Sequence, residues 1–397
     1  MNLLEPVVQP YAWGSSFAIA EIQGRPTPSP GPEAELWMGA HQSAPSGVER
    51  DGLATTLDAV IAADPIGELG QECVDRFGPR LPFLLKILAA EKALSIQVHP
   101  DRSQAEAGFQ AENDRGMSQG DPARNYVDDW PKPEVLCALT PFEALAGFRD
   151  PGEAADLLET LEIEDLNPVA VALRGIKTPS SLAGALGRIL SWPQPARAAL
   201  LDDVVAACAG IAAEGGPHAG SCGAAVRISS DHPADIGVLA SLLFEHLVLQ
   251  PGEALFMPAG GLHAYIRGVG VELLANSDNV LRAGLTGKHM DVAELLRIVD
   301  PSVAVPVLQP RQVTESVVVY DTPVPEFRLY RLACTAGDLP VPGYGPRIVL
   351  CLHGGAVLRD ASGTQLKLGR GQSCFLSAAD GPATAAGPAT LVTATLG

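Results

Sequence analysis

The sequence predicts a mainly β fold into which a group of helices is inserted, and three observations support this prediction. Short apolar stretches with strand-like alternation occur before residue 150 and again after residue 244. Residues 151–225 instead form alanine- and leucine-rich segments at helical spacing. One β pattern at residues 247–263 returns at 366–382, which indicates two similar barrels in one chain.

The composition describes a globular chain with more than one domain. Its 397 residues are 47% hydrophobic and 18% charged, enough for two or three cores. The formal charge of −19 argues against nucleic acid or an anionic membrane as a partner. Seven scattered cysteines favour the cytoplasm over a disulfide framework. We find neither a signal-peptide pattern nor an apolar run of about 18 residues.

The N-terminal part reads as strands, then helices, then strands. Aromatic and glycine punctuation in residues 1–50 predicts short strands and loops, whereas Asp51–Gly78 has amphipathic helical spacing. The next stretch, LPFLLKILAAEKALSIQVHP (81–100), holds two apolar runs on either side of Glu91–Lys92. We expect these runs to form a hairpin.

Two helix-start signals follow. Asp101, with Gln104 three residues later, predicts a capping box. The sequence DPGE, beginning at Asp150, predicts an N-cap aspartate followed by proline at the first helical position. A polar loop and two strands are expected between these signals. After Asp150 the helices run to a loose segment at 215–223, and one more helix is expected near 234–244.

These patterns divide the chain into three predicted domains. Residues 1–150 plus 226–318 form a catalytic barrel, 151–225 form a helical insertion, and 319–397 form a second barrel. In the gapless alignment of the two β patterns, Pro382 stands where His263 stands. We therefore expect the C-terminal barrel to hold no catalytic metal.

A polar stripe in the apolar segment Lys92–Asp101 predicts a metal site. In a strand, Ser95, Gln97 and His99 would share one face, and Gln97 with His99 suits two adjacent ligands. Glu134 and His263 supply a carboxylate and a second imidazole, which suit zinc first and manganese, cobalt, nickel or iron as alternatives. The competing interpretation is a half-solvated sheet face with structural histidines.

Side chains suited to binding an anion occur near these ligands in the sequence. His263, Tyr265 and Arg267 would share one strand face. Asp291 and Glu294 look like a helix cap instead. The remaining candidates are charged residues in or beside predicted strands: Lys86, Lys132, Glu272, Arg282 and Lys288.

Six motifs give the chain a specific resemblance. They are QPYAWGS, ELWMGAHQSAPS, LPFLLKILAAEKALSIQVHPD, KPEVLCAL, PAGGLHAY and NSDNVLRAGLTGK, and they span residues 10 to about 300. Together they resemble the type I mannose-6-phosphate isomerases. The resemblance implies a cupin (jelly-roll) barrel holding one zinc per chain, a helical insertion domain, and a second, non-catalytic jelly-roll barrel. It also implies interconversion of mannose 6-phosphate and fructose 6-phosphate.

The resemblance assigns residues to roles. Gln97, His99, Glu134 and His263 match the metal ligands, and Arg282 matches an active-site arginine. Further matches to pocket positions are Lys86, Lys132, Tyr265, Glu272 and Lys288. The chain departs from the family in two places: Pro131 replaces a frequent histidine, and Gly287 replaces a frequent proline. No acid or base role can be carried over to Pro131, and the loop bearing Lys288 is expected to be looser.

The expected chemistry moves a proton between two sugar carbons through an enediolate. Either Glu272 or Lys132 would be the general base, and Arg282 would stabilise the enediolate or hold the substrate. Lys86 and Lys288 are the candidates for the phosphate, and Ser95 and Tyr265 complete the substrate-binding set.

Two other functions remain open from the residues alone. One is an iron-dependent cupin oxidase, which the four-ligand set disfavours because it leaves fewer positions for oxygen. The other is a non-enzymatic sugar-binding cupin. As partners we expect a sugar phosphate, no nucleic acid and no membrane, with the chain a monomer or weak dimer.

Overall fold

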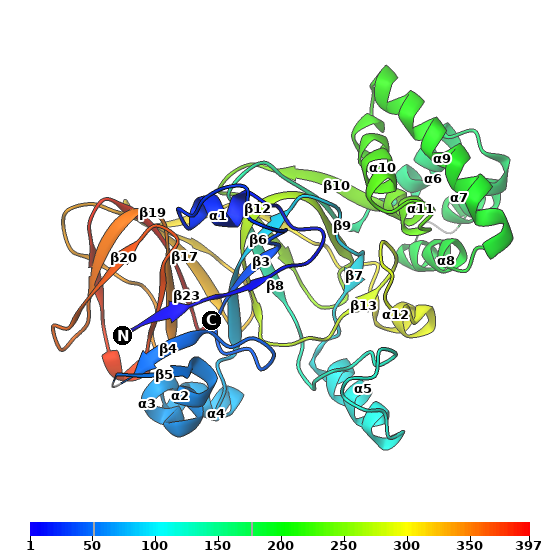
Figure 1. Ribbon diagram of the computed structural model, residues 1–397. Helices are drawn as coiled ribbons and strands as arrows, with labels where there is room; N and C mark the ends of the chain where they lie inside the picture. The colour runs from blue at the N-terminus through cyan, green and yellow to red at the C-terminus, as the bar shows by residue number, and fades with distance from the viewer. Residues whose placement is uncertain (51, 176–177) are drawn as a thin grey trace.

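The computed structural model describes residues 1–50, 52–175 and 178–397. Its strands gather in two β bodies that lie side by side, and a group of helices stands apart at one end (Figure 1). This arrangement confirms the predicted fold class, mainly β with inserted helices.

The first β body is an 11-stranded sheet whose central strand is β12 (His263–Ala275). The first half of β12 pairs with β9 (Phe142–Phe148) and β7 (Gln97–Val98), and the second half pairs with β6 (Phe83–Ala90) and β8 (Glu134–Ala138). This long strand therefore joins two layers of the sheet. The other strands of this sheet are β2 (Val7–Gln9), β3 (Glu35–Met38), β6 (Phe83–Ala90), β7 (Gln97–Val98), β8 (Glu134–Ala138), β9 (Phe142–Phe148), β10 (Phe244–Leu249), β11 (Ala254–Met257), β13 (Leu281–Arg282) and β14 (Val307–Leu308).

The second β body, with 12 strands, is built around the equally long β19 (Arg347–Arg359). As in β12, the two halves of this strand have different partners. The first half pairs with β21 (Ser373–Leu376) and β23 (Ala389–Thr395), and the second half pairs with β20 (Gln365–Gly369) and β22 (Thr384–Ala386). The repeated β pattern agrees with this likeness, because β11 and β21 coincide in the gapless alignment. The C-terminal strands are β15 (Arg311–Thr314), β16 (Val317–Tyr320), β17 (Arg328–Cys334), β18 (Leu339–Pro340), β19, β20 (Gln365–Gly369), β21 (Ser373–Leu376), β22 (Thr384–Ala386) and β23 (Ala389–Thr395).

Three strands from the start of the chain also belong to the second body. They are β1 (Asn2–Glu5), β4 (Gly47–Arg50) and β5 (Leu53–Thr56), and β1 pairs directly with β21. Assigning all of residues 1–150 to the first barrel does not match this pairing. One apolar cluster contains Phe83 and Phe256 of the first body with Phe327 and Phe375 of the second, so the two bodies share a core.

The helices begin where the capping signals predict. Asp101 and Gln104 form a capping box at α5 (Arg102–Asp114), and the Asp150 side chain accepts the N–H groups of the first turn of α6 (Pro151–Thr160). The region Asp51–Gly78 contains β5 and then three short helices, α2 (Leu57–Ala63), α3 (Pro65–Leu69) and α4 (Gln71–Phe77). Asp51 itself lies outside the described residues.

The helical group ends later than predicted. It contains α6, α7 (Asn167–Gly175), α8 (Pro179–Leu190), α9 (Gln194–Glu214) and α10 (Ala219–Asp231). The segment expected to be loose at 215–223 is therefore helical from Ala219, because Ala224, Ala225 and Ile228 give α10 a buried face. The short helix α11 (Gly237–Ala240) follows. No helix among the described residues is long and apolar enough to cross a membrane.

The predicted hairpin over residues 81–100 is wrong. Strand β6 pairs with β12 and β3, whereas β7 pairs with β12 and β13. Residues 91–96 leave the sheet as a loop, because the backbone of Ala93 bonds to side chains at the end of α10 rather than to a strand. Ser95 is therefore a loop residue rather than part of a strand face.

Candidate metal centre and the cavity above it

Three of the predicted ligands meet inside the first β body. His99, Glu134 and His263 come from the end of β7, the start of β8 and the start of β12, and all three are buried. Glu134 Oε2 lies 3.5 Å from His99 Nε2 and 3.3 Å from His263 Nε2. A tetrahedral zinc with bonds of about 2.0–2.1 Å separates its ligand atoms by roughly 3.3 Å, so these spacings fit zinc.

The atoms that face one another in this cluster have no hydrogen-bond partner among the described residues. Nε2 of His99, Nε2 of His263 and Oε2 of Glu134 are all buried and unpaired. Buried polar atoms are normally paired, so three unpaired atoms that converge on one point indicate a cation-binding site. Two imidazoles and a carboxylate are ligands that zinc commonly binds in proteins.

Hydrogen bonds at the outer ring nitrogens orient the two imidazoles. His99 Nδ1 lies 2.7 Å from the Asn279 carbonyl oxygen, and His263 Nδ1 lies 3.4 Å from that of Gly261. A proton on Nδ1 leaves the Nε2 lone pair free for a metal. Burial lowers the pKa of His99 to about 4, although Glu134 opposes this effect, and the neutral ring is the ligand form.

Asn279, whose carbonyl oxygen orients the His99 ring, is itself held by several hydrogen bonds. Its side-chain amide donates to the carbonyl oxygens of Asp128 at 2.8 Å and Trp130 at 2.9 Å. Its amide oxygen accepts the N–H of Val127 at 2.8 Å. This supporting residue was missed from the sequence, although its position inside NSDNVLRAG offered a signal.

The fourth predicted ligand, Gln97, pairs with His263 in the strand register and lines the same cavity. Its role as a ligand stays a prediction. The cavity above the cluster has a volume of about 480 Å³. Besides Gln97 and Glu134, the site residues predicted from sequence that line it are Lys86, Ser95, Lys132, Tyr265, Glu272, Arg282 and Lys288.

One wall of the cavity is a network of paired charges. Lys86 Nζ lies 3.3 Å from a carboxylate oxygen of Glu35 and 3.3 Å from one of Glu272. The Tyr265 hydroxyl donates to Glu272 at 2.9 Å, and Lys132 Nζ lies 3.2 Å from Glu134 Oε1. The charge of Lys86 is therefore already balanced by two carboxylates.

These contacts perturb the pKa values of the buried groups. Burial by itself lowers the pKa of Lys86, but Glu35 and Glu272 raise it above the usual value. Burial also raises the pKa of Glu272, and the opposing effect of Lys86 is smaller. Burial would raise the pKa of Glu134 as well, yet Lys132 and His99 hold it well below its usual range.

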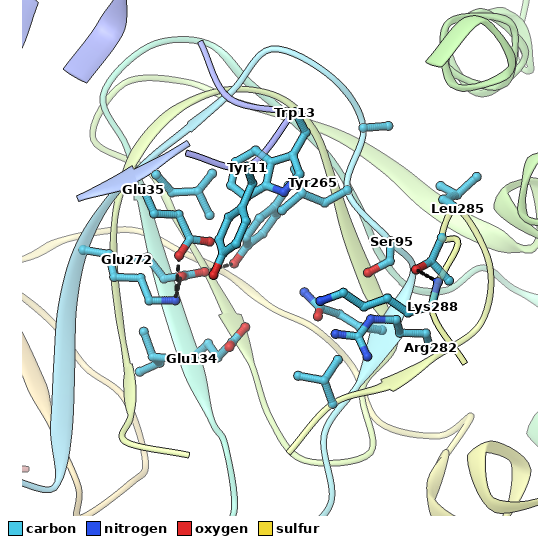
Figure 2. Close-up of a pocket in the computed structure, with 18 of the residues that line it drawn as sticks. Tyr11, Trp13, Glu35, Ser95, Glu134, Tyr265, Glu272, Arg282, Leu285 and Lys288 are labelled. Atoms are coloured by element: carbon cyan, nitrogen blue, oxygen red, sulfur yellow. Dashed lines mark hydrogen bonds and ion pairs between the residues drawn. The ribbon is translucent and has the colours of Figure 1, made fainter. Parts of the chain in front are cut away.

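The opposite wall carries unpaired positive charge. Figure 2 shows Ser95, Arg282 and Lys288 together, across the cavity from Glu35, Glu134 and Glu272. Among the described residues, neither Arg282 nor Lys288 has a carboxylate within ion-pair distance. Burial lowers the pKa of Arg282, and burial followed by the charge of Arg282 lowers that of Lys288. Such a pair of cations is suited to an anion.

One predicted face of β12 is wrong. Arg267 was expected beside His263 and Tyr265, but it is exposed and donates to the Glu91 carbonyl oxygen. The register of β12 against β9 shifts between Tyr265 and Arg267, and this bulge changes which residues face inward. It is the same shift that lets Glu272 point into the cavity with Tyr265.

Several cavity residues were missed by sequence reasoning. Glu35 and Trp37 lie two residues apart on β3, and Trp37 Nε1 donates to Glu35 at 2.5 Å. This alternation was a signal that could have found them. His41 Nε2 lies 3.3 Å from Asp278 Oδ1. Tyr11 and Trp13, whose rings stack at 5.8 Å, line the mouth.

Residues 1–151 match the family model for the type I phosphomannose isomerase catalytic domain. The chain is 36% identical to the mannose-6-phosphate isomerase of Escherichia coli over 396 residues, which covers 98% of this chain and 97% of the relative. It is 32% identical to the rat enzyme of the same name, covering 94% and 93%.

Solved structures agree with these sequence matches. The fold superposes on a zinc-bound mannose 6-phosphate isomerase with a TM-score of 0.90 at 33% identity, covering 100% of this chain and 99% of the other. A K86A variant of the Salmonella typhimurium phosphomannose isomerase gives a TM-score of 0.92 at the same identity and coverage.

Proposed function

We infer that this chain, which belongs to the type I phosphomannose isomerases, interconverts mannose 6-phosphate and fructose 6-phosphate with one zinc per chain. The observation that carries this function is a set of three buried ligand atoms that have no hydrogen-bond partner among the described residues. One of them belongs to Glu134, which lines a cavity together with other acidic and cationic side chains. The cupin fold is the one expected from the sequence, and neither an oxidase nor a pure sugar-binding protein is favoured.

We propose that His99, Glu134, His263 and Gln97 hold the metal. The three charged or imidazole ligands converge within 4.8 Å, and Gln97 lines the cavity beside them. When bound, zinc supplies Lewis acidity at the sugar oxygens. Because Gln97 is a neutral ligand, the metal would keep a net positive charge.

Charge separation across the cavity supports one orientation of the substrate. The phosphate would lie against Lys288, an exposed residue of the cavity lining whose positive charge is unpaired among the described residues. Ser95 would donate a hydrogen bond to the phosphate. Arg282 would contact the oxygens of the enediolate with its planar set of donors. Lys86 is less suited to the phosphate than the sequence suggested, because Glu35 and Glu272 already neutralise it.

Glu272 is the better supported of the two candidate bases. Its burial raises the pKa of the carboxyl, which suits a group that takes a proton from one carbon and returns it to the next. Tyr265 donates to it at 2.9 Å and would fix its orientation. Lys132 uses its ammonium group as a charge partner of Glu134 at 3.2 Å, so we assign Lys132 to substrate and ligand positioning.

A coupled assay tests this function. The purified chain should convert mannose 6-phosphate to fructose 6-phosphate, lose activity when a chelator removes its zinc, and regain it when zinc returns. His99→Ala and His263→Ala should each abolish turnover, because each removes a ligand.

Three outcomes would contradict the assignment in different ways. Normal turnover by protein that elemental analysis shows to be metal-free would exclude the metal role. Oxygen consumption would indicate an oxidase. Binding of the sugar phosphate without turnover by zinc-loaded protein would indicate a binding protein. The cytoplasmic location and the monomeric or weakly dimeric state stay predictions, which fractionation and light scattering can check.

A further inference from the structure

The chain segment that leads out of the helical group, Asp231–Gly237, contacts both loops on the cationic side of the cavity. Asp231 and His232 end helix α10 and line the cavity. The segment then continues through Asp235 to the start of α11. It carries the chain from the helices back to the first β body, whereas the connection from β9 into α6 lies at the other end of the helical group.

The first contact fixes the loop that bears Ser95. The Ala93 N–H donates to Asp231 Oδ2 at 3.0 Å, and the Ala93 carbonyl oxygen lies 2.7 Å from His232 Nε2. Both backbone groups of one loop residue are thus satisfied by two consecutive residues at the end of α10. These side chains take the place of strand partners at Ala93, whereas the neighbouring Leu94 N–H donates to the Tyr265 carbonyl oxygen of β12 at 2.8 Å.

The second contact fixes the loop between Arg282 and Lys288. Asp235 Oδ1 accepts the N–H of Leu285 at 2.9 Å, and its Oδ2 accepts that of Thr286 at 3.1 Å. Hydrogen bonds to a carboxylate are stronger than those between neutral groups. Leu285 has a φ of 56°, a left-handed conformation that needs such support.

The connection continues to Lys288 through one hydroxyl. The Thr286 Oγ1 accepts the N–H of Lys288 at 3.1 Å. Close packing adds to it, since a Cβ on Gly284 would lie 2.6 Å from the Gly237 Cα. The path from Asp235 to the Lys288 backbone therefore consists of two hydrogen bonds and one residue.

Arg282 is held in a different way. It lies on β13 and pairs with Gln97 of β7, so its backbone belongs to the sheet rather than to the loop. Loss of the Asp235 carboxylate should disturb Lys288 and leave Arg282 in place.

We propose that Asp235 is a positioning residue that sets the affinity for the substrate phosphate by holding the loop of Lys288. The helical group would thereby serve the active site through its exit segment. This inference rests on the proposed function, in which Lys288 contacts the phosphate and Arg282 acts on the chemical step.

Steady-state kinetics of Asp235→Asn on mannose 6-phosphate tests the proposal. The amide keeps the size of the side chain but loses the charge and one acceptor. We expect KM to rise about tenfold, the equivalent of one charge-assisted hydrogen bond, with kcat within about twofold and zinc content unchanged. Inhibition by inorganic phosphate should weaken in parallel.

A double-mutant cycle separates positioning from a general structural effect. If Asp235 acts through Lys288, the same substitution in a Lys288→Ala background should change KM little, because the group to be positioned is gone. Asp291→Asn is the matched control: it removes an aspartate that caps α12 (Val292–Ile298) just beyond the loop, and it should leave KM unchanged.

A milder pair of variants covers the case in which Asp235→Asn does not fold. Thr286→Ala removes the hydroxyl that accepts the Lys288 N–H and should raise KM, whereas Thr286→Ser keeps it and should not. Unchanged KM in Asp235→Asn, or full additivity in the cycle, would overturn the proposal while the wild-type chain still turned over. A wild-type chain without turnover would instead refute the proposed function.

Discussion

At the scale of single residues, the two lysines on opposite walls of the cavity use their charge differently. Lys86 is buried between the carboxylates of Glu35 and Glu272, whereas Lys288 has no carboxylate within ion-pair distance among the described residues. One charge stabilises the protein's own anions, and the other is available to a ligand.

The pairing of Lys86 with Glu272 sets the expected response of activity to pH. A base must be deprotonated to accept a proton, so kcat should fall as the pH drops through the raised pKa of Glu272. Lys86 favours the charged carboxylate. Lys86→Met should therefore raise that pKa further and move the acid limb of the kcat profile to higher pH.

Lys92→Met provides the control for this measurement, because Lys92 also lines the cavity and forms no ion pair with a carboxylate among the described residues. Its profile should match that of the wild type. Coincident acid limbs for the Lys86 variant and the wild type would show that Glu272 is not the titrating base.

Arg282 should act on turnover more than on binding. Its guanidinium would contact the enediolate more strongly than the ground-state sugar, and removing one such donor typically lowers turnover about 100- to 1,000-fold. We expect Arg282→Ala to show this loss with little change in KM, and Arg282→Lys to recover only part of it because an ammonium lacks the planar donors.

Steady-state kinetics on mannose 6-phosphate decides between this role and a grip on the phosphate. A large rise in KM at nearly normal kcat would assign Arg282 to the phosphate instead.

At the scale of elements, features that depend on neighbouring residues, such as helix caps, were predicted better than the pairing of strands. The caps at Asp101 and Asp150 were predicted correctly, because a cap depends on residues within one turn. The hairpin over 81–100 was wrong, since β6 pairs with β3 and β12, which are both distant from it in sequence, and not with β7. Alternation shows that a strand exists but not which strand lies beside it.

In the candidate site too, residues within local motifs were predicted, and residues that matter through contacts with distant elements were not. The residue types and motifs singled out His99, Glu134 and His263, which the fold brings together. Glu35 and Asp235 were missed, because their importance comes from contacts with Lys86 and with the loop at Leu285. Those contacts join elements that are distant in the chain. The alternation of Glu35 and Trp37 indicates a strand face but not its contact with Lys86, and Asp235 has no such local pattern.

The loop of Lys288 offers an element-scale prediction at Gly287. A Cβ there would meet nothing within 4 Å, and its φ lies outside the left-handed region. Gly287→Pro should reduce the freedom of the unfolded chain and stabilise the protein by about 0.4–1 kcal/mol. A stiffer loop should also lower KM for mannose 6-phosphate.

Thermal unfolding and kinetics would measure both effects, with Gly287→Ala as the control that removes less freedom. A raised KM in the proline variant would mean that the loop must move when substrate binds.

At the scale of the whole molecule, the two β bodies depend on each other. Strand β1 begins the chain yet pairs with β21 near its end, and the shared cluster joins Phe83 and Phe256 to Phe327 and Phe375. Burial of such side chains is worth about 1.5–3 kcal/mol each, a large fraction of the stability of a typical domain.

A chain cut after residue 318 should therefore fail to fold alone, even though it keeps every predicted ligand. Circular dichroism and thermal scans should show no cooperative transition for residues 1–318, and adding the fragment 319–397 should restore one. A stable, active 1–318 fragment would show that the second body is dispensable.

The bulge in β12 has a consequence for how sequences of this kind can vary. His263 and Glu272 lie nine positions apart on one strand, an odd interval that would place them on opposite faces without the register shift between Tyr265 and Arg267. One deletion or insertion in this interval would turn the acid away from the metal without altering either residue. We expect aligned relatives that keep the activity to be gap-free here, and a gap to identify a copy that has lost it.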